Sequence, residues 1–251
     1  MNRKSTDTDF IYGIKPVLEG LEEGKKIDKI LIKKGKSDEN TEDIIAKAKQ
    51  INIPFFFVPQ EKLDRLTRKN HQGCIALISP IDFHRIEDIL PQIFETGDLP
   101  LVMILDGLTD VRNFGAITRT CLSAGFHTII IPSKNFARIS PDAVKTSAGA
   151  LLKIPICREE NLESTFQFLQ ESGLQIVVAS EKAEDNYYQV DFTQPTAIVM
   201  GAEDTGVSLN LIRKAEKLVK IPMHNQFDSL NVSVAAGVLS FEAVKQRLIE
   251  S

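Results

Sequence analysis

The sequence predicts an α/β protein that is built from two parts. In the second part an apolar strand at Leu101–Asp106, a helix and another strand at Thr128–Pro132 follow one another, which is the order of a βαβ unit in a parallel, doubly wound sheet. Continuous apolar strands recur at Gln175–Ala179 and Thr196–Met200, as expected for strands that are covered on both faces. Shorter strands and helices alternate before residue 80, which indicates a separate, smaller α/β layer.

The smaller part is expected to span residues 10–80, after a polar segment over residues 1–9 that we expect to be disordered. The periodicity predicts helices and then strands at Lys15–Glu22, Glu39–Gln50 and Lys62–Leu66, and at Ile27–Ile32, Phe55–Val58 and Cys74–Ile78. The loop Thr67–Gly73 between the last two elements is basic and polar, so it is the best candidate here for a contact with RNA. A plain surface loop is the alternative, and His71 within it is interpreted as a turn residue rather than a catalyst.

Residues 81–100 change in character, because Pro80, Pro91, Gly97 and Pro100 bracket one amphipathic segment at Ile86–Phe94. We interpret this stretch as the linker between the two parts. The second part then spans residues 101–251. Besides the strands already named, its pattern predicts a strand at Leu218–Pro222 and helices at Asn113–Ala124, Pro141–Leu151, Leu162–Glu171, Leu209–Lys217 and Val232–Ile249.

Composition places the chain among soluble globular proteins. Of its 251 residues, 43% are hydrophobic and 25% are charged. No apolar run approaches the roughly 18 residues of a membrane helix, and the first ten residues lack the apolar region of a signal peptide. The three cysteines, Cys74, Cys121 and Cys157, are odd in number and widely spaced, so we expect reduced, buried thiols rather than a disulfide framework or a zinc site. A cytoplasmic protein is expected.

The charge is distributed unevenly along the chain. The net charge is −4 overall, but residues 1–85 carry a net charge of +3 and the remaining residues a net charge of −7. A weakly basic first part is compatible with a local RNA-binding surface, because phosphate is attracted by the surface that faces it rather than by the total charge. Solvated lysines on an ordinary small domain explain the same numbers equally well.

Several common enzyme motifs are absent from the sequence. No G-x-G-x-x-G follows the first strand of the second part, and there is no G-K-[ST] phosphate loop. Enzymes that use nicotinamide dinucleotides or nucleoside triphosphates therefore lack their usual fingerprints here. No Ser-His-Asp order and no carboxylate-rich metal cluster stands out, so no metal is expected.

Three polar clusters remain once the strands and helices are assigned. They are Asn113–Arg119 at the start of a helix, the acidic loop Gly201–Gly206, and the pair Ile221–Met223 with Ser229–Ala235. Each cluster alone has a structural explanation: Asn113 is a good N-cap, the acidic loop is a tight turn, and the last segment begins a capped, buried helix. Together, polar loops at strand ends favour a ligand site, with Gly201–Gly206 and His224–Asn231 expected at the same sheet edge.

The motifs N-F-G-A-I-x-R, G-A-E-D-T-G and I-P-M…S-L-N-V-S-V-A resemble, in order and spacing, the three motifs of the SpoU/TrmH family of RNA ribose 2′-O-methyltransferases. The resemblance covers residues 101–251. The segments IYGIKPVLEGL and HQGCIAL are similar to parts of the L30e-like substrate-binding domain of RlmB-type members, which methylate a guanosine of 23S ribosomal RNA.

The resemblance implies a SPOUT-type α/β domain with a C-terminal trefoil knot, the cofactor S-adenosylmethionine and a homodimer. It places the cofactor contacts on Gly201, Ile221 and Leu230, with Met223 and Ser229 close by. These residue types make physical sense, because a glycine lets backbone approach a ligand and the two apolar side chains supply walls for adenine.

The resemblance also implies that Asn113, Arg119, Glu203, Ser229 and Asn231 surround the reacting ribose. The ribose 2′-oxygen attacks a methyl group on a cationic sulfur, so the protein helps mainly by positioning and by placing charge. A free arginine has a pKa above about 12, which makes Arg119 a poor base. We interpret Arg119 as a fork that holds the RNA phosphate, with that phosphate or Glu203 taking the proton.

One departure from the family pattern lies beside the motif glutamate. Many family members carry a second glycine after that glutamate, whereas Asp204 and Thr205 follow Glu203 here. The additional charge puts fine inference about the substrate in doubt but leaves methyl transfer in place. The alternatives are the same reaction on transfer RNA, against which the first part of the chain counts, a non-catalytic RNA-binding protein of this fold, and a dinucleotide enzyme.

Overall fold

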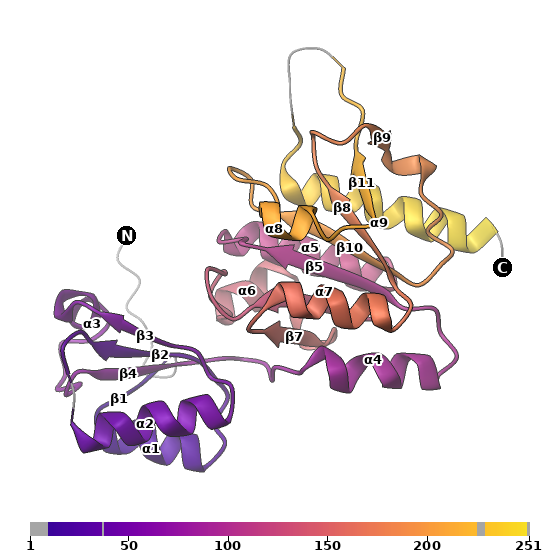
Figure 1. Ribbon diagram of the computed structural model, residues 1–251. Coiled ribbons are helices and arrows are strands. Elements are labelled where there is room, and N and C mark those ends of the chain that lie inside the picture. Colours follow the sequence, from indigo (N-terminus) through magenta and orange to yellow (C-terminus); the bar gives the residue numbers. More distant parts are fainter. Residues whose placement is uncertain (1–9, 37, 225–228, 250–251) are drawn as a thin grey trace. The chain divides into compact units, whose positions relative to one another are not determined.

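The computed structural model describes residues 10–36, 38–224 and 229–249. The predicted disordered segment 1–9 and residues 225–228 of the predicted loop His224–Asn231 lie outside the described residues. The chain divides into two compact units near residue 82 (Figure 1).

The first unit is a four-stranded mixed sheet with three helices, in the strand order β1-β4-β2-β3. Strand β4 runs antiparallel to β1 and β2, while β2 and β3 are parallel. The predicted elements are present, most with the expected ends, and β1 is an additional strand that the sequence did not predict. The bounds are β1 Phe10–Tyr12, α1 Ile14–Glu22, β2 Ile27–Lys33, α2 Glu39–Gln50, β3 Phe55–Val58, α3 Gln60–Leu66 and β4 Cys74–Ile78.

Helix α2 shows how local signals define this unit. Asp38 caps the helix, since its carboxylate accepts a hydrogen bond from the Thr41 backbone nitrogen at 2.9 Å and lies 2.8 Å from the Lys36 ammonium. The hydrogen bond from the Lys36 side chain, with those from Thr41, lowers the pKa of Asp38 to about 2. The helix then buries Ile44 and Ala48 against the sheet.

The second unit is a parallel sheet with the strand order β7-β6-β5-β10-β8-β11-β9, seven strands within the described residues. Each neighbouring pair runs parallel, so the predicted α/β class is confirmed. The bounds before the middle of the unit are α4 Ile86–Glu95, β5 Leu101–Asp106, α5 Val111–Ser123, β6 Thr128–Pro132, α6 Pro141–Thr146, the 3₁₀ turn η1 Ala150–Leu152, β7 Ile156–Glu159 and α7 Leu162–Glu171. They continue with β8 Gln175–Ala179, β9 Asp185–Asn186, the 3₁₀ turn η2 Tyr187–Gln189, β10 Thr196–Gly201, α8 Leu209–Ile212, β11 Lys217–Lys220 and α9 Val232–Ile249.

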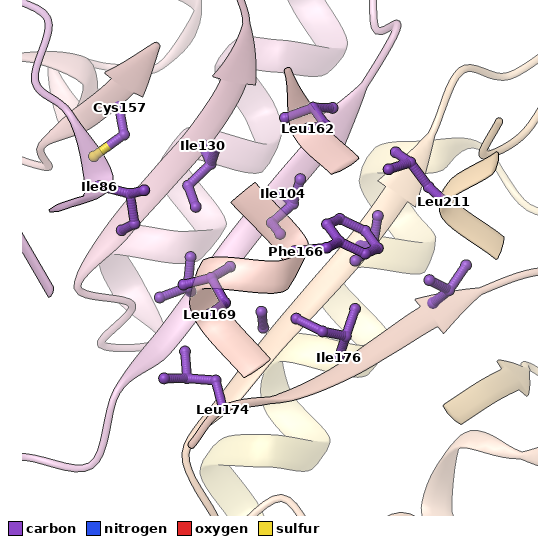
Figure 2. Close-up of a cluster of buried hydrophobic side chains, with 14 of the residues drawn as sticks. Ile86, Ile104, Ile130, Cys157, Leu162, Phe166, Leu169, Leu174, Ile176 and Leu211 are labelled. Carbon is purple, nitrogen blue, oxygen red and sulfur yellow. The ribbon is translucent and has the colours of Figure 1, made fainter. Parts of the chain in front are cut away.

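Helices cover both faces of this sheet (Figure 1). Helices α4 and α7 share one buried cluster with alternate residues of the strands, such as Ile104 of β5 and Val199 of β10. Figure 2 shows Phe166 and Leu169 of α7 in this cluster with Ile104. Helices α5 and α9 pack against each other over the other face. No helix in the described part of the chain is long and apolar enough to cross a membrane.

The segment interpreted as a linker carries α4, which belongs to the core of the second unit. Ile86, Leu90 and Ile93 recur at helical spacing and are buried with the strands. Proline in the middle of this segment does not prevent the helix, because Pro91 lies at its sixth residue and α4 continues to Glu95. Burial of the apolar stripe therefore outweighs the turn signals around it.

Two predicted helices are shorter than expected. The helix predicted over Pro141–Leu151 ends at Thr146, because Ala148 and Gly149 take left-handed φ values of 51° and 84°. The helix predicted over Leu209–Lys217 ends at Ile212, and the strand expected from Leu218 starts at Lys217. Pairing with β8 explains the second difference, since strand hydrogen bonds compete for the residues that helical periodicity claimed.

Candidate active site

A cavity of about 330 Å³ opens at the carboxyl ends of β8, β10 and β11. Strand ends of this kind are where open α/β sheets hold their ligands. The loop after β10 and the segments before and at the start of α9 supply most of its wall. All the residues predicted to contact a cofactor line this one cavity: Gly201, Ile221, Met223, Ser229 and Leu230.

Gly201 is required by the path of the loop that follows β10. A Cβ atom there would lie 2.0 Å from the Gly206 carbonyl carbon and 2.2 Å from the Val207 nitrogen, so no other residue fits. The loop closes on itself through a hydrogen bond from the Gly206 nitrogen to the Ala202 oxygen at 2.9 Å. Gly206 has a left-handed φ of 67°, which favours a second glycine. The two glycines thus fold the acidic loop into a compact wall of the cavity.

The cavity has an apolar floor and a polar rim. Met200 and Val219 supply apolar surface from inside the sheet. Ser180, Glu181 and Lys182 add polar groups from the loop after β8, and the sequence analysis missed them. The signal was available, because these residues follow a buried strand in the same way as Gly201 does.

Asn231 connects the loop after β10 with helices α5 and α9. Its amide nitrogen donates hydrogen bonds to the Glu203 carboxylate and, at 3.2 Å, to the Asn113 side-chain oxygen. Its amide oxygen accepts from the Ser233 backbone nitrogen at 3.0 Å and from the Ser233 hydroxyl at 2.5 Å. Because the oxygen caps α9, the amino group is directed to the carboxylate. Asn113, Glu203 and Asn231, predicted from separate motifs, therefore form one network.

The prediction that Asn113 caps its helix is wrong. Helix α5 begins at Val111, and Asp110 is the N-cap. The Asp110 carboxylate accepts hydrogen bonds from the backbone nitrogens of Arg112 at 2.6 Å and Asn113 at 3.2 Å. Asn113 is the third residue of α5, and its side chain is free to meet Asn231 instead. Aspartate is an equally good cap, so the sequence offered two candidates and the structure selects the earlier one.

Arg119 is not brought into this network. It lies on α5 with its side chain exposed, six residues after Asn113. Six residues turn a helix by about 600°, so Arg119 projects roughly 120° away from Asn113 around the axis. Over residues 10–36, 38–224 and 229–249 no hydrogen bond or ion pair holds its guanidinium. Arg119 is therefore presented to solvent, where it can receive an anionic group.

A basic cavity of about 600 Å³ lies in the first unit. Lys33 and Lys36 from the end of β2 and Lys69 from the predicted loop Thr67–Gly73 line it. The loop is braced by the buried His71, which lies 2.8 Å from the Asp64 carboxylate and accepts a hydrogen bond from the Gly73 nitrogen at 3.0 Å. His71 therefore holds the loop in shape, as the turn interpretation predicted.

The cysteines are buried, free thiols, as predicted. Burial raises the pKa of Cys74 and of Cys157 to about 12, and it raises the pKa of Cys121 as well. A thiol with so high a pKa is a poor nucleophile at neutral pH. The chemistry of the second unit therefore rests on the polar loops rather than on cysteine.

Two protein-family models match the chain. The model of the SpoU rRNA Methylase family matches residues 100–241. The model described as RNA 2′-O ribose methyltransferase substrate binding matches residues 10–84. The matched ranges follow the two units of the structure, and each contains one of the cavities described above.

Individual relatives agree over almost the whole length. The chain is 36% identical to a 23S rRNA (guanosine-2′-O-)-methyltransferase RlmB of Pseudomonas putida, over 96% of this chain and 97% of that protein. It is 31% identical to the putative TrmH family tRNA/rRNA methyltransferase YacO of Bacillus subtilis, over 97% and 98%. The crystal structure of an AdoMet-bound rRNA methyltransferase from Sinorhizobium meliloti is similar with a TM-score of 0.61 and 27% identity, over 94% of this chain and 87% of that one. The resemblance predicted from the three motifs is confirmed: the chain belongs to the SpoU rRNA Methylase family.

Proposed function

We propose that this protein transfers a methyl group from S-adenosylmethionine to the ribose 2′-hydroxyl of a guanosine in 23S ribosomal RNA. One observation carries the proposal: the cavity after β8, β10 and β11 borders the network of Asn113, Glu203 and Asn231, because Glu203 belongs to both. A small-molecule site and a polar site for a second reactant are thus adjacent. The named activity of the Pseudomonas putida relative supports the choice of reaction and of nucleoside.

The cavity fits S-adenosylmethionine in size and in chemistry. Its volume of about 330 Å³ falls within the range of small-ligand sites. Ile221 and Leu230 offer apolar walls to adenine, and Gly201 keeps the wall beside it free of a side chain. The Glu181 carboxylate can accept hydrogen bonds from ribose hydroxyls or an ammonium group. The bound cofactor supplies an electrophilic methyl group on a cationic sulfur.

The network beside the cavity positions the hydroxyl that attacks. Asn231 holds the Glu203 carboxylate in one orientation, and Asn113 shares that contact. A carboxylate fixed in this way can accept the proton that the 2′-hydroxyl loses, so the network favours Glu203 over the RNA phosphate as the acceptor. We assign Arg119 to the phosphate, because a planar guanidinium that is exposed and unpaired binds phosphate through two parallel hydrogen bonds.

The first unit is proposed to bind RNA through its basic cavity. Lys33, Lys36 and Lys69 converge there beside the braced loop, and lysines attract phosphate in a way that does not depend on base sequence. The matching substrate-binding family model supports this role for residues 10–84. An rRNA-modifying role also supports a cytoplasmic location.

A homodimer is proposed from the surface of α9. Val234, Phe241 and Leu248 are seven residues apart on this helix, and their side chains are 52%, 52% and 70% exposed. Residues at this spacing form one apolar stripe along a helix. A second copy of the chain would cover the stripe with an identical one, as in a two-fold interface.

Transfer of a labelled methyl group to purified 23S ribosomal RNA and to bulk transfer RNA, followed by mapping of the modified nucleotide, tests the proposed function. We expect label on the ribose of one guosine-type nucleotide, a guanosine, in ribosomal RNA. Label confined to transfer RNA would favour the second substrate that the name of the Bacillus subtilis relative includes. Cofactor binding without transfer to either RNA would contradict the proposal and favour a non-catalytic RNA-binding protein.

A further inference from the structure

A second cavity opens at the same edge of the sheet as the cofactor cavity. Its volume is about 420 Å³, and it lies at the carboxyl ends of β5, β6 and β7. The polar residues that give it its character are Asp106, Lys134, Asn135, Glu160, Glu163 and Asn210. None of them belongs to the three family motifs or to the network around Asn231.

The two cavities lie on either side of one loop. Residues 201–206 line the cofactor cavity, and Ser208 and Asn210 line the second one. A hydrogen bond from the Ser208 nitrogen to the Asp106 carboxylate at 2.8 Å holds the loop to the end of β5. Gly107, in the wall of the second cavity, faces Ala202, since a Cβ on Gly107 would lie 3.9 Å from the Ala202 Cβ. Ala202 precedes Glu203, so the second cavity begins next to the proposed ribose position.

The charges of the second cavity exclude the RNA backbone as its occupant. Three carboxylates line it against one lysine, and phosphate would be repelled. Two of the carboxylates already have partners: Asp106 accepts from Ser208, and Glu163 pairs with the Lys214 ammonium at 3.0 Å. In the part of the chain that the structure describes, no hydrogen bond or ion pair holds the carboxylate of Glu160. A neutral ring with several N–H donors is the ligand that suits such a group.

We propose that this second cavity receives the guanine base of the target nucleotide, with Glu160 accepting hydrogen bonds from its N1–H and N2–H groups. Lys134 and Asn135 are the donors available for the O6 and N7 acceptors of the same base. Adenine presents an acceptor where guanine presents N1–H, so the Glu160 carboxylate would oppose it. Enzymes that modify a nucleotide take it out of its stack into such a pocket. The inference rests on the proposed function, because it deepens the identity of the substrate at that site.

The test compares one synthetic RNA that carries the mapped target guanosine with the same RNA carrying inosine at that position. Inosine lacks only the N2 amino group. For the wild-type protein we expect kcat/KM to fall about 10- to 100-fold with inosine, which is the worth of a hydrogen bond to a charged group. For Glu160→Gln we expect the two RNAs to be methylated at nearly equal rates, both close to the wild-type rate with inosine.

Two further variants make the result specific. Lys134→Met should lower kcat/KM about equally for both RNAs, because inosine retains O6. Glu171→Gln, at the far end of α7 and outside the cavity, should keep the wild-type ratio. Unchanged affinity for S-adenosylmethionine verifies that each variant is folded.

The outcomes separate the two proposals. A wild-type protein that methylates guanosine and inosine equally, or a Glu160→Gln protein that keeps the full preference, overturns the assignment of the base cavity while the proposed function stands. A wild-type protein that binds cofactor but methylates neither RNA overturns the proposed function and this inference together.

Discussion

Asn231 shows how one side chain can link folding and chemistry. Its amide oxygen caps α9, while its amide nitrogen donates to Glu203 and Asn113. The cap determines the direction of the amide, and the amide in turn determines where the carboxylate points. A residue of another shape at this position would lose the helix start and the orientation of Glu203 together.

Most site residues could be predicted at this scale, and the exceptions have physical reasons. Gly201, Ile221 and Leu230 were found because the motifs are continuous in sequence and follow buried strands. Glu160 was not found, because a lone glutamate after a strand has no local signal that separates it from a surface residue. The cap of α5 was misassigned because Asp110 and Asn113 have the same capping chemistry, and only the observed helix start distinguishes them.

His127 makes the stability of the second unit depend on pH. Its Nδ1 atom accepts a hydrogen bond from the Leu101 nitrogen at 3.1 Å, and burial lowers the pKa of the ring below the usual 6.5. Below pH 6.5 the unfolded chain therefore binds more protons at this residue than the folded chain does, so the free energy of unfolding falls as the pH drops from about 6.5 through the folded pKa.

We expect urea unfolding of the second unit between pH 7.5 and 5 to show this loss, and His127→Gln to flatten it. His84→Gln, which changes an exposed side chain, is the matched control and should leave the slope as in the wild type. The same slope in the wild type and in His127→Gln would show that burial of His127 has no effect on stability.

At the scale of elements, the strand ends of the parallel sheet organise every site. The cofactor cavity follows β8, β10 and β11, and the second cavity follows β5, β6 and β7. The strands themselves could be predicted closely, because strands that are buried on both faces have long apolar runs. Helices were harder where tertiary contacts prevail: α8 is cut short by the pairing of β11, and α6 by the left-handed residues after Thr146.

The loop after β10 provides a prediction at this scale. Gly201→Ala places a methyl group about 2 Å from the backbone of Gly206 and Val207, so the loop must open. We expect unfolding to become easier by about 3 kcal/mol or more and S-adenosylmethionine to bind at least about 10-fold more weakly, because the displaced loop is a wall of the cavity. Urea unfolding and calorimetric titration measure the two effects.

Gly237→Ala is the matched control for this substitution. Gly237 lies within α9 with open space around the position of a Cβ atom. Alanine there should stabilise the helix by roughly 0.5–1 kcal/mol and leave cofactor affinity unchanged. Wild-type stability and affinity in Gly201→Ala would mean that the loop has freedom that its present path does not suggest.

At the scale of the whole molecule, the two units divide the work between basic RNA binding and methyl transfer. The uneven charge distribution along the sequence already pointed to this division, although it could not separate an RNA surface from ordinary solvated lysines. The trefoil knot and the L30e-like nature of the first unit stay predictions that rest on the resemblance. Strand periodicity cannot give a knot, since it says nothing about which loop the chain passes through.

Assembly of the whole molecule is tested on the apolar stripe of α9. Phe241→Glu should raise the dissociation constant of the dimer about 100-fold or more, because a charge would be buried at the centre of the interface. Phe57→Glu in the first unit is the control, since Phe57 is 51% exposed and Phe241 is 52% exposed. Sedimentation equilibrium measures both. A monomeric wild-type protein, or a Phe241→Glu protein that dimerises as the wild type does, would contradict the proposed interface.

The central claim is that one cavity binds the cofactor while the adjoining network performs the transfer. A direct test measures the S-adenosylmethionine affinity and the single-turnover methylation rate of Glu203→Gln on the RNA that the wild type modifies, with Glu184→Gln on an exposed loop as the control. We predict that Glu203→Gln binds cofactor within about twofold of the wild type and transfers methyl groups at least about 100-fold more slowly, because its amide cannot accept the proton. A Glu203→Gln protein that methylates RNA at the rate of the wild type would contradict this account.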